Sequence, residues 1–190
     1  MATGSKQTFF DILRFAIITL LIVIPVRAYV AQPFIVSGIS MDPTYKNGEY
    51  LIVDELSYHF QDPKRGEVVV FRYPKDPSKF FIKRVIGLPG ETVSISGSSI
   101  NITTSAGEEL ALEEPYIDPQ DEYQPTELTL KKEEYFVMGD NRDSSLDSRA
   151  WGPVTETAIK GRVALRLLPL TKVNLFPGDY SGSYITTLNQ

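Results

Sequence analysis

The feature that most constrains the fold is an apolar run near the amino terminus. Phe15 to Val26 carries no charged side chain, and a helix extended to Ile12–Val30 has nineteen residues, which cover about 28 Å at the rise of an α-helix. Arg14 and Arg27 lie close enough to its ends to reach lipid headgroups. The run predicts one membrane-spanning helix, with its amino end in the cytoplasm because Lys6 and Arg14 precede the apolar centre.

Two alternatives compete with a membrane span. A buried core helix should show a polar stripe along one side, and this run shows none. A cleaved secretion signal is the other alternative, because Val26 and Ala28 could be the small residues before a cleavage site. Pro25 and the weakly charged amino end argue against that signal. A span and a secretion signal would both export the rest of the chain.

Composition limits what the remaining residues can do. A chain of 190 residues buries one sizeable core, so one folded domain is expected. Its net charge of -5 and its pI near 5.0 argue against nucleic-acid binding, which favours basic surfaces. The lack of cysteine excludes disulfides, thiolate metal ligands and a cysteine nucleophile, and the single His59 excludes a zinc site built from several histidines.

After the apolar run, short segments rich in Val, Ile, Tyr and Phe alternate with Gly, Pro, Asn and Asp. This pattern is typical of β-strands, and it predicts a mainly β domain. The expected strands are 50–53, 67–73, 80–86, 92–95, 99–103, 135–138 and 160–168.

Changes in composition suggest the boundaries of the domains. We expect a cytoplasmic stub and anchor over residues 1–31, a β domain over 32–175 and a tail over 176–190. The stretch 96–132 is polar, acidic and rich in Pro, so it predicts a small β cap inserted in the domain. The segment 172–190 shows little periodicity, and no role is assigned to it.

A serine-containing turn follows directly after the apolar run. Residues 37–44 read Ser-Gly-Ile-Ser-Met-Asp-Pro-Thr, in which Gly38 and Pro43 bend the backbone. Such a bend can expose Ser40 and direct nearby N–H groups to one point, as acyl transfer requires. A serine-rich loop that only leads into a sheet is the structural alternative.

A lysine lies inside an apolar strand further along the chain. In a strand, Phe81, Lys83, Val85 and Gly87 share one face, so the Lys83 amine is expected among apolar or small neighbours. Burial disfavours the ammonium form and lowers the pKa of a lysine, which then can take a proton from a serine hydroxyl. The alternative is a lysine that reaches solvent or pairs with an acid.

A third segment, residues 139–153, is dense in acids, arginines and serines. Three acids and two arginines within it predict a loop whose charges satisfy one another, and which could hold a serine hydroxyl against Lys83. A calcium loop is the competing interpretation. It is disfavoured because the acids lack the EF-hand spacing and because Arg142 and Arg149 would compete with a cation, so no metal and no cofactor are expected.

These segments, in this order, resemble the sequence boxes of the bacterial type I signal peptidase family. The resemblance covers roughly residues 27–163, and Glu67 stands where aspartate is often found. The matching boxes are Ser40-Met41-Asp42-Pro43-Thr44, Arg65-Gly66-Glu67-Val68-Val69-Val70, Lys83-Arg84-Val85-Ile86-Gly87-Leu88-Pro89-Gly90, and Gly139-Asp140-Asn141-Arg142-Asp143-Ser144 with Asp147-Ser148-Arg149.

The resemblance implies an antiparallel β-sheet catalytic domain with a Ser-Lys catalytic dyad. Ser40 matches the nucleophile, Lys83 the general base, and Ser145 the serine that hydrogen-bonds the lysine amine. The Ser40 N–H would contribute to the oxyanion hole. Gly38 belongs to the same region and occupies a position where some members have a serine whose hydroxyl helps to bind the oxyanion, which leaves the second donor open.

The resemblance also implies supporting charges around the dyad. Asp147 and Arg149 match an ion pair that supports the site. Asp140 and Arg84 match charged positions that brace it.

By the same resemblance, the chain is expected to be a serine endopeptidase that removes signal peptides from exported preproteins, after small residues at the first and third positions before the cut. The expected location is the cytoplasmic membrane, with the catalytic domain on the extracytoplasmic face. Its partners would be preproteins and the lipid bilayer, and contact with the protein translocation machinery is left open. An apolar cleft, to which a peptide adds by β-augmentation, is expected to involve Phe34, Ile35, Ile39, Met41, Phe81 and Ile82.

Three other functions compete with this hypothesis. A self-cleaving repressor protease resembles the family in its Ser-Lys dyad, but it acts in the cytosol behind a DNA-binding domain, and the predicted anchor argues against it. Relatives with a histidine base are disfavoured because His59 has no matching serine box around it. The third is a catalytically inactive, membrane-tethered β module that binds peptides.

Overall fold

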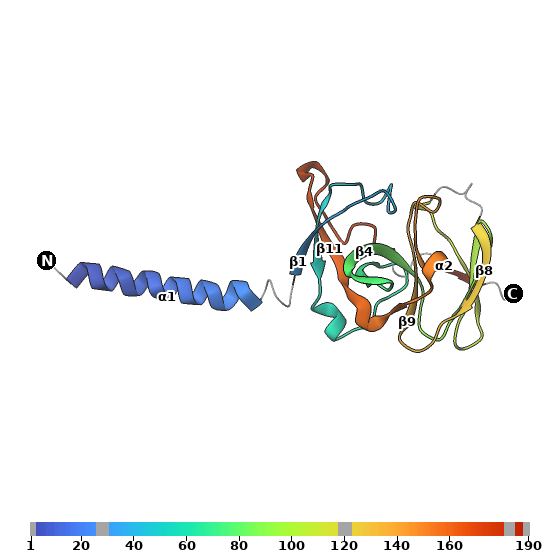
Figure 1. Cartoon of the computed structure of the whole chain (residues 1–190), viewed down its shortest axis with the longest axis horizontal. Coiled ribbons are helices and arrows are strands. Elements are labelled where there is room, and N and C mark those ends of the chain that lie inside the picture. Colours follow the sequence, from blue (N-terminus) through green and yellow to red (C-terminus); the bar gives the residue numbers. More distant parts are fainter. Residues whose placement is uncertain (1–2, 26–30, 118–122, 181–184, 188–190) are drawn as a thin grey trace.

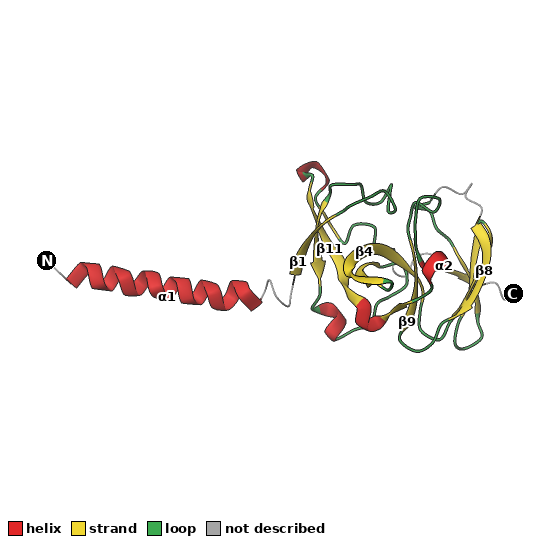
Figure 2. Ribbon diagram, in the orientation of Figure 1, coloured by secondary structure: helices red, strands yellow, loops and turns green. Residues whose placement is uncertain are grey.

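The computed structural model describes residues 3–25, 31–117, 123–180 and 185–187. In this part of the chain, a long amino-terminal helix precedes two antiparallel β-sheets (Figures 1 and 2). The sheets confirm the mainly β, antiparallel fold expected from the sequence. Residues 26–30 of the expected membrane span lie outside the described residues.

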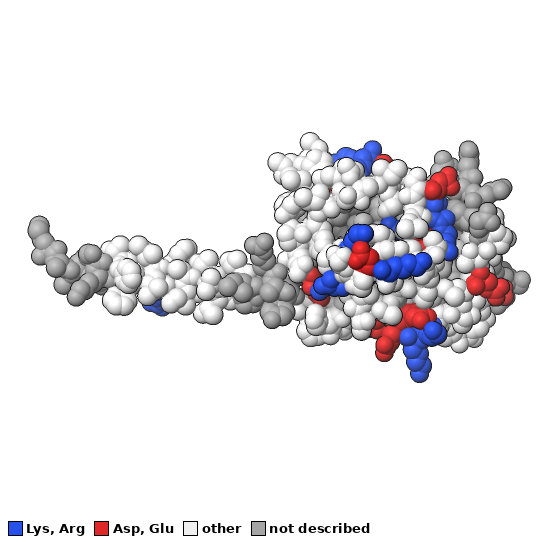
Figure 3. All heavy atoms as spheres, in the orientation of Figure 1, with Lys and Arg blue, Asp and Glu red and all other residues white. Residues whose placement is uncertain are grey.

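The amino-terminal helix α1 spans Thr3–Pro25. Its large apolar side chains are exposed, among them Phe15 and Leu21, and the face shown in Figure 3 is almost entirely uncharged. Within the part of the chain that the structure describes, no helix reaches the length and the hydropathy that a membrane span requires.

The first sheet has the strand order β1-β2-β11-β3-β4-β9-β10, with β12 paired to β11. All of these pairs are antiparallel, and β1 forms one edge. The strands are β1 (Ala31–Ile35), β2 (Tyr50–Asp54), β3 (Val68–Tyr73), β4 (Asp76–Gly87), β9 (Glu134–Met138), β10 (Val154–Thr155), β11 (Ile159–Leu168) and β12 (Asn174–Leu175).

The second sheet lies at the end of the β structure opposite α1 (Figure 1). Its order is β13-β7-β6-β5-β8, again antiparallel. The strands are β5 (Thr92–Gly97), β6 (Ser99–Thr103), β7 (Glu109–Leu112), β8 (Tyr123–Thr129) and β13 (Ile185–Thr187). Much of the stretch expected to form a β cap therefore belongs to this sheet, and residues 118–122 of that stretch lie outside the described part.

Short helices lie between strands of the first sheet. They are α2 (Ser148–Trp151) and the 3-10 helices η2 (Ser57–His59), η3 (Glu156–Ala158) and η4 (Leu170–Lys172).

All seven strands expected from the sequence are present, with ends that differ by a few residues. Their alternation is reflected in burial: along β2, Leu51 and Val53 point into the core while their neighbours are only half-buried. The segment expected to be a featureless tail differs from the prediction, because β12 and β13 lie within it.

Three apolar clusters hold the sheets together. One joins the two sheets, with Ile86 and Phe136 of the first sheet packed against Val93 and Ile102 of the second. The other two lie around the first sheet, where Val53, Val68 and Val70 belong to one cluster and Val69, Phe71 and Val85 to the other. Because β4 contributes to all three clusters, it is a rigid support for any side chain that it carries.

Candidate active site

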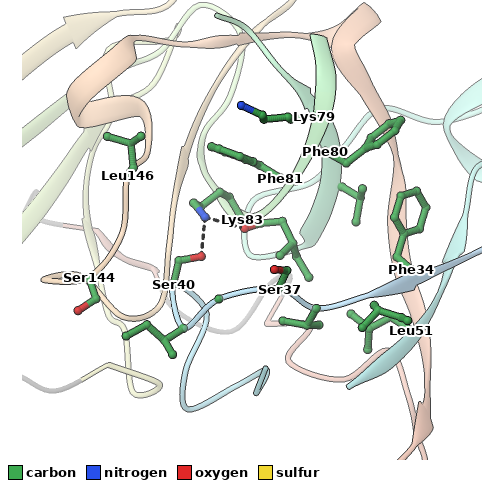
Figure 4. A pocket seen from close by; sticks show the side chains of 16 residues that line it. Phe34, Ser37, Ser40, Leu51, Lys79, Phe80, Phe81, Lys83, Ser144 and Leu146 are labelled. Carbon is green, nitrogen blue, oxygen red and sulfur yellow. Dashed lines mark hydrogen bonds between the residues drawn. The ribbon is translucent and has the colours of Figure 1, made fainter. Parts of the chain in front are cut away.

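Ser40 and Lys83, forty-three positions apart in the sequence, meet at the first sheet. The Lys83 Nζ lies 2.7 Å from the Ser40 Oγ and donates a hydrogen bond to it, as the dashed line in Figure 4 shows. The amine also donates to the Ile82 carbonyl at 2.9 Å. A serine hydroxyl and a lysine amine at this distance can exchange a proton.

Lys83 is almost completely buried, with 3% of its surface exposed. Burial lowers its pKa from 10.5 to about 8, while the charges of Asp147 and Asp140 oppose part of this shift. The Lys83 Nζ also lies 5.5 Å from the centre of the Phe81 ring. The apolar strand position of Lys83 therefore has the predicted consequence, a lysine that is partly neutral near neutral pH.

The loop that carries Ser40 connects β1 to β2 and is fixed by backbone hydrogen bonds at both ends. The Val36 N–H donates to the Glu49 carbonyl at 2.9 Å, and the Gly48 N–H donates to the Val36 carbonyl at 2.9 Å. At its centre, the Asn141 N–H donates to the Ser40 carbonyl at 3.1 Å. The loop at residues 139–153 thus contacts the candidate nucleophile directly.

Arg84, the residue after Lys83, forms a buried ion pair with Asp140. The Arg84 Nε lies 2.9 Å from Asp140 Oδ1, and the Arg84 Nη2 lies 2.6 Å from Asp140 Oδ2. Both side chains are completely buried. Thr44, in the serine box, donates to the same carboxylate at 2.5 Å. This ion pair links the lysine strand, the serine loop and the segment after β9.

Asp147 and Arg149 also form an ion pair, in which the Arg149 Nε donates to Asp147 Oδ1 at 2.8 Å and the Arg149 Nη2 to Asp147 Oδ2 at 2.9 Å. The buried Asp147 carboxylate caps the start of α2 and accepts the Gly139 N–H at 3.1 Å. A side chain at Gly139 would overlap Ser145 and the Ser40 carbonyl. The loop is therefore packed directly against the candidate nucleophile.

Ser145 does not make the hydrogen bond expected from the sequence resemblance. Its Oγ is buried and has no hydrogen-bond partner within the described residues. The Lys83 amine instead donates to Ser40 and to the carbonyl of its own neighbour, Ile82. Ser145 packs against Gly139, on the side of that glycine that also faces the Ser40 carbonyl.

Gly38 adopts a left-handed backbone conformation, with φ of 103°. Its N–H donates to Asn47 Oδ1 at 2.9 Å. This amide is already engaged within the protein, so it is not available as a second oxyanion donor in this arrangement.

An apolar cleft of about 580 Å³ opens beside Ser40 and Lys83. In Figure 4, Phe34, Leu51 and Phe80 lie on one side of the pair, and Leu146 lies on the other. Five of the six residues expected in a substrate cleft line it, namely Phe34, Ile35, Ile39, Phe81 and Ile82.

Met41 is the exception, and its assignment to the cleft was wrong. Its side chain is 1% exposed and packs in the core with Val36, Tyr45 and Leu51. Because Met41 follows Ser40 in a turn, the two side chains take different directions, and the methionine fills the core under the loop.

Sequence reasoning missed several residues of the cleft, above all Phe80, Ser144 and Leu146. Phe80 could have been found, because it lies three residues before Lys83 on the strand. Ser144 and Leu146 could not, since their approach to the cleft depends on how the loop at 139–153 folds back.

His59 lies outside the cleft and is exposed, in agreement with the interpretation as a surface residue. Among the described residues, no group of three or more His, Cys, Asp or Glu side chains is arranged to hold a metal ion.

Comparison with known proteins agrees with these sequence boxes. The family model described as "Signal peptidase, peptidase S26" matches residues 9–168. A probable signal peptidase I-2 of Synechocystis sp. is 33% identical over 180 residues, which cover 92% of this chain and 80% of that protein. Signal peptidase I P of Bacillus subtilis subsp. natto is 33% identical over 176 residues, which cover 88% of this chain and 94% of that protein.

Among solved structures, a signal peptidase I from Enterococcus faecalis V583 aligns with a TM-score of 0.46 and 30% identity, over 54% of this chain and 97% of that one. The match of the family model to most of the chain, and the identity and coverage of the relatives, decide the assignment. This chain belongs to the bacterial type I signal peptidase family.

Proposed function

We propose that this serine endopeptidase removes signal peptides from exported preproteins, with Ser40 as nucleophile and Lys83 as general base. One observation carries the proposal: the Lys83 amine is buried, lies 2.7 Å from the Ser40 hydroxyl and borders an apolar cleft. Membership of the signal peptidase family supports the same activity.

The lowered pKa makes the amine effective as a base. With a pKa of about 8 in place of 10.5, the neutral fraction of Lys83 at pH 7 rises roughly 300-fold. A neutral amine has a lone pair that can accept the Ser40 proton. Nearby carboxylates do not replace this role, because Asp147 is already paired to Arg149 and Asp140 to Arg84.

The proposed reaction has two steps. Ser40 Oγ attacks the carbonyl carbon of the scissile bond while Lys83 Nζ takes the hydroxyl proton, and the tetrahedral intermediate collapses when the ammonium returns that proton to the leaving amine. Water then attacks the ester on Ser40 while Lys83 takes a proton from that water. The Lys83 ammonium gives this proton to the Ser40 oxygen as the ester bond breaks. The Ser40 N–H is the proposed first oxyanion donor.

The cleft suits an extended peptide. β1 is an edge strand, and β9 pairs with β4 only from Arg84 onward, so the part of β4 before Lys83 is paired to β3 alone. A peptide lying between β1 and β4 could hydrogen-bond to either strand by β-augmentation. We propose that it is cut after a small-x-small motif, since the bulky side chains of Phe81 and Ile39 line the cleft beside Ser40 and Lys83 and leave less room for large substrate side chains.

We further propose that α1 is a single-pass anchor in the cytoplasmic membrane, with residues 32–175 on the extracytoplasmic face and the second sheet as a cap. Apolar side chains such as Phe15, Leu20 and Leu21 are exposed on the helix, where water would be an unfavourable neighbour. A lipid bilayer would cover them. The anchor would hold the Ser40 loop, which follows β1, close to the membrane that holds the substrate.

The decisive experiment is incubation of the detergent-solubilised full chain with a preprotein that carries a signal peptide, followed by mass analysis of the products. The proposal predicts one cut after a small-x-small triplet. Ser40→Ala and Lys83→Arg should each lower turnover on the order of a millionfold, because arginine keeps the charge but cannot act as a base. Lys79→Arg, on the same strand, is the matched control and should remain active.

Two results would reject the proposed function. A folded wild-type protein that binds the preprotein without cutting it would be a peptide-binding module. Retained turnover in Lys83→Arg would remove Lys83 from the role of base.

A further inference from the structure

The segment Phe176–Tyr180 follows β12 and lies beyond the residues 9–168 that match the family model. It contacts the supports of both candidate catalytic residues. The Tyr45 hydroxyl donates to the Pro177 carbonyl, and Arg84 Nη1 donates to the Gly178 carbonyl. The Tyr180 N–H also donates to the Gly66 carbonyl at 3.4 Å.

On one side, the segment holds the loop that carries Ser40. Tyr45 is completely buried at the end of that loop, and its N–H donates to the Met41 carbonyl at 2.8 Å. Burial raises the pKa of the Tyr45 phenol well above its ordinary value, so the hydroxyl stays protonated and donates to Pro177. Gly178, with φ of 69°, approaches Thr44 so closely that an added Cβ would overlap the Thr44 methyl group.

On the other side, the segment holds the strand that carries Lys83. The neighbouring Arg84 guanidinium donates to the Gly178 and Gly66 carbonyls and lies 3.9 Å from the Tyr116 ring centre and 4.9 Å from the Tyr180 ring centre. The two tyrosine rings are themselves stacked, with centres 4.9 Å apart. Arg84 is thereby fixed on several sides by main-chain oxygens, aromatic rings and Asp140.

We propose that residues 176–180 form a strap that positions the Ser40 loop and the Lys83 strand relative to each other, and so sets the geometry of the catalytic pair. The inference rests on the proposed Ser40–Lys83 mechanism. The strap is a positioning element. Among the described residues, no hydrogen bond joins Pro177 or Gly178 to Ser40 or Lys83, and the two residues act through Tyr45, Thr44 and Arg84.

The strap makes proton transfer between Ser40 and Lys83 depend on residues far along the chain. The Ser40 loop and β4 are separate segments, and a shift of one against the other changes the distance from oxygen to amine. A displacement of about 1 Å in an active site can lower the rate roughly a hundredfold. The strap hydrogen-bonds to Tyr45, Arg84 and Gly66 and not to the cleft wall that Phe34 and Phe80 form, so substrate affinity should change little.

The test is Gly178→Ala in the full chain, with kcat measured per active site titrated with an acylating inhibitor. The added methyl should push Thr44 away, and we expect kcat to fall roughly ten- to a hundredfold with KM changed less than about twofold. Adding Thr44→Ser should restore most of kcat, because serine keeps the hydroxyl that bonds Asp140 and lacks the overlapping methyl. Thr44→Ser alone provides the baseline.

Gly97→Ala is the matched control for backbone strain. Gly97 has φ of 57°, and an added Cβ there meets nothing within 4 Å, so kcat per active site should match the wild type. The folded fraction of every variant is followed by the fluorescence of Trp151, the only tryptophan.

If Gly178→Ala does not fold, Tyr45→Phe decides. It removes only the hydroxyl that bonds Pro177, and it should lower kcat about tenfold. Tyr58→Phe is its control, because it removes a phenol hydrogen bond to Glu67 that does not involve the strap.

The strap is rejected if Tyr45→Phe and any folded Gly178→Ala protein keep kcat per active site within about twofold of their controls, or if they change KM alone. Failure of the proposed function looks different: the wild type itself would not cut the preprotein, or Ser40→Ala would still cut it.

Discussion

The Lys83 amine combines deep burial with neutral hydrogen-bond partners. It contacts the Ser40 hydroxyl and the Ile82 carbonyl, and no carboxylate forms an ion pair with it among the described residues. Asp147 and Asp140 raise its pKa from a distance, but burial is the larger effect. The ammonium form of Lys83 therefore destabilises the folded state. The proposed chemistry requires this destabilisation, because it lowers the pKa of the amine that acts as the base.

We predict that Lys83→Met stabilises the fold and abolishes turnover, because methionine fills the buried position without a charge and cannot act as a base. The pKa is about 8 in the folded state and 10.5 ordinarily, so the free energy of unfolding of the wild type rises with pH between these values, where the unfolded chain binds more protons. Below pH 8 both states are protonated and the penalty is full, about 3 kcal/mol.

Denaturant unfolding of Lys83→Met and wild type from pH 6 to pH 10 measures the effect. The gain should be largest below pH 8 and should shrink as the pH approaches 10.5. Lys79→Met, an exposed lysine on the same strand, should show no such trend. A loss of stability in Lys83→Met at pH 6 would contradict the account.

At the scale of single residues, the local sequence predicted the burial of Lys83. The sequence boxes also predicted that Ser40 and Lys83 lie together, with the charged residues of the ion pairs Arg84–Asp140 and Arg149–Asp147 around them. Prediction from the sequence failed where the direction of a side chain depends on a turn, as for Met41. It also failed where the contacts of a residue come from distant segments of the chain. The stacking of Tyr180 on Tyr116 beside Arg84 is such a long-range contact, and no local sequence pattern predicts it.

Among the elements, the strands with clear alternation were predictable and the irregular ones were not. β1 was missed because it directly follows the apolar run and contains Pro33, which normally argues against a strand. An edge strand tolerates proline, since one side of it needs no partner, and β1 is at the edge. β13 has only three residues, and its pairing with β7 is a long-range event.

The position of β1 beside the cleft gives a prediction for substrate binding. Phe34 of β1 and Phe80 of β4 are in edge-to-face contact, with ring centres 5.4 Å apart, and both line the cleft. Phe34→Ala should raise KM for a preprotein roughly tenfold through lost apolar contact, with a smaller change in kcat. Steady-state kinetics will separate the two constants.

Phe60→Ala provides the comparison, because Phe60 is 83% exposed and does not line the cleft. It should leave KM unchanged. Equal KM values for Phe34→Ala and wild type would exclude the Phe34 side of the cleft from substrate binding.

In the whole molecule, the carboxy-terminal segment connects the two sheets: Pro177 and Gly178 contact the supports of the site in the first sheet, and β13 joins the second. The sequence provided the two-part plan of an apolar amino-terminal segment followed by a β domain. It did not predict that the carboxy-terminal residues return to the site, because their hydrogen bonds are made by main-chain carbonyls, which carry no sequence signal.

The exposed apolar side chains of α1 lead to a prediction for the intact protein. If the helix is the anchor, Leu20→Arg combined with Leu21→Arg should move the chain from the membrane fraction to the soluble fraction, because charges near the centre of a span cost several kcal/mol. Cleavage of a short soluble peptide should persist. The control is Leu56→Arg combined with Phe60→Arg, at two exposed apolar residues of the β region, and it should leave the protein in the membrane fraction. If the two double variants divide equally between the membrane and soluble fractions, α1 is not the anchor.

The most direct test of the proposed Ser40–Lys83 chemistry is an NMR titration of the Lys83 side chain in the folded enzyme, alongside the pH profile of kcat/KM. The Lys83 signal is assigned by comparison with Lys83→Arg. We predict a pKa of about 8 for Lys83 and an activity that rises with pH through the same value, because only the neutral amine accepts the Ser40 proton. A Lys83 that remains protonated until about pH 10.5, in an enzyme that is already fully active at pH 8, would contradict the proposed chemistry.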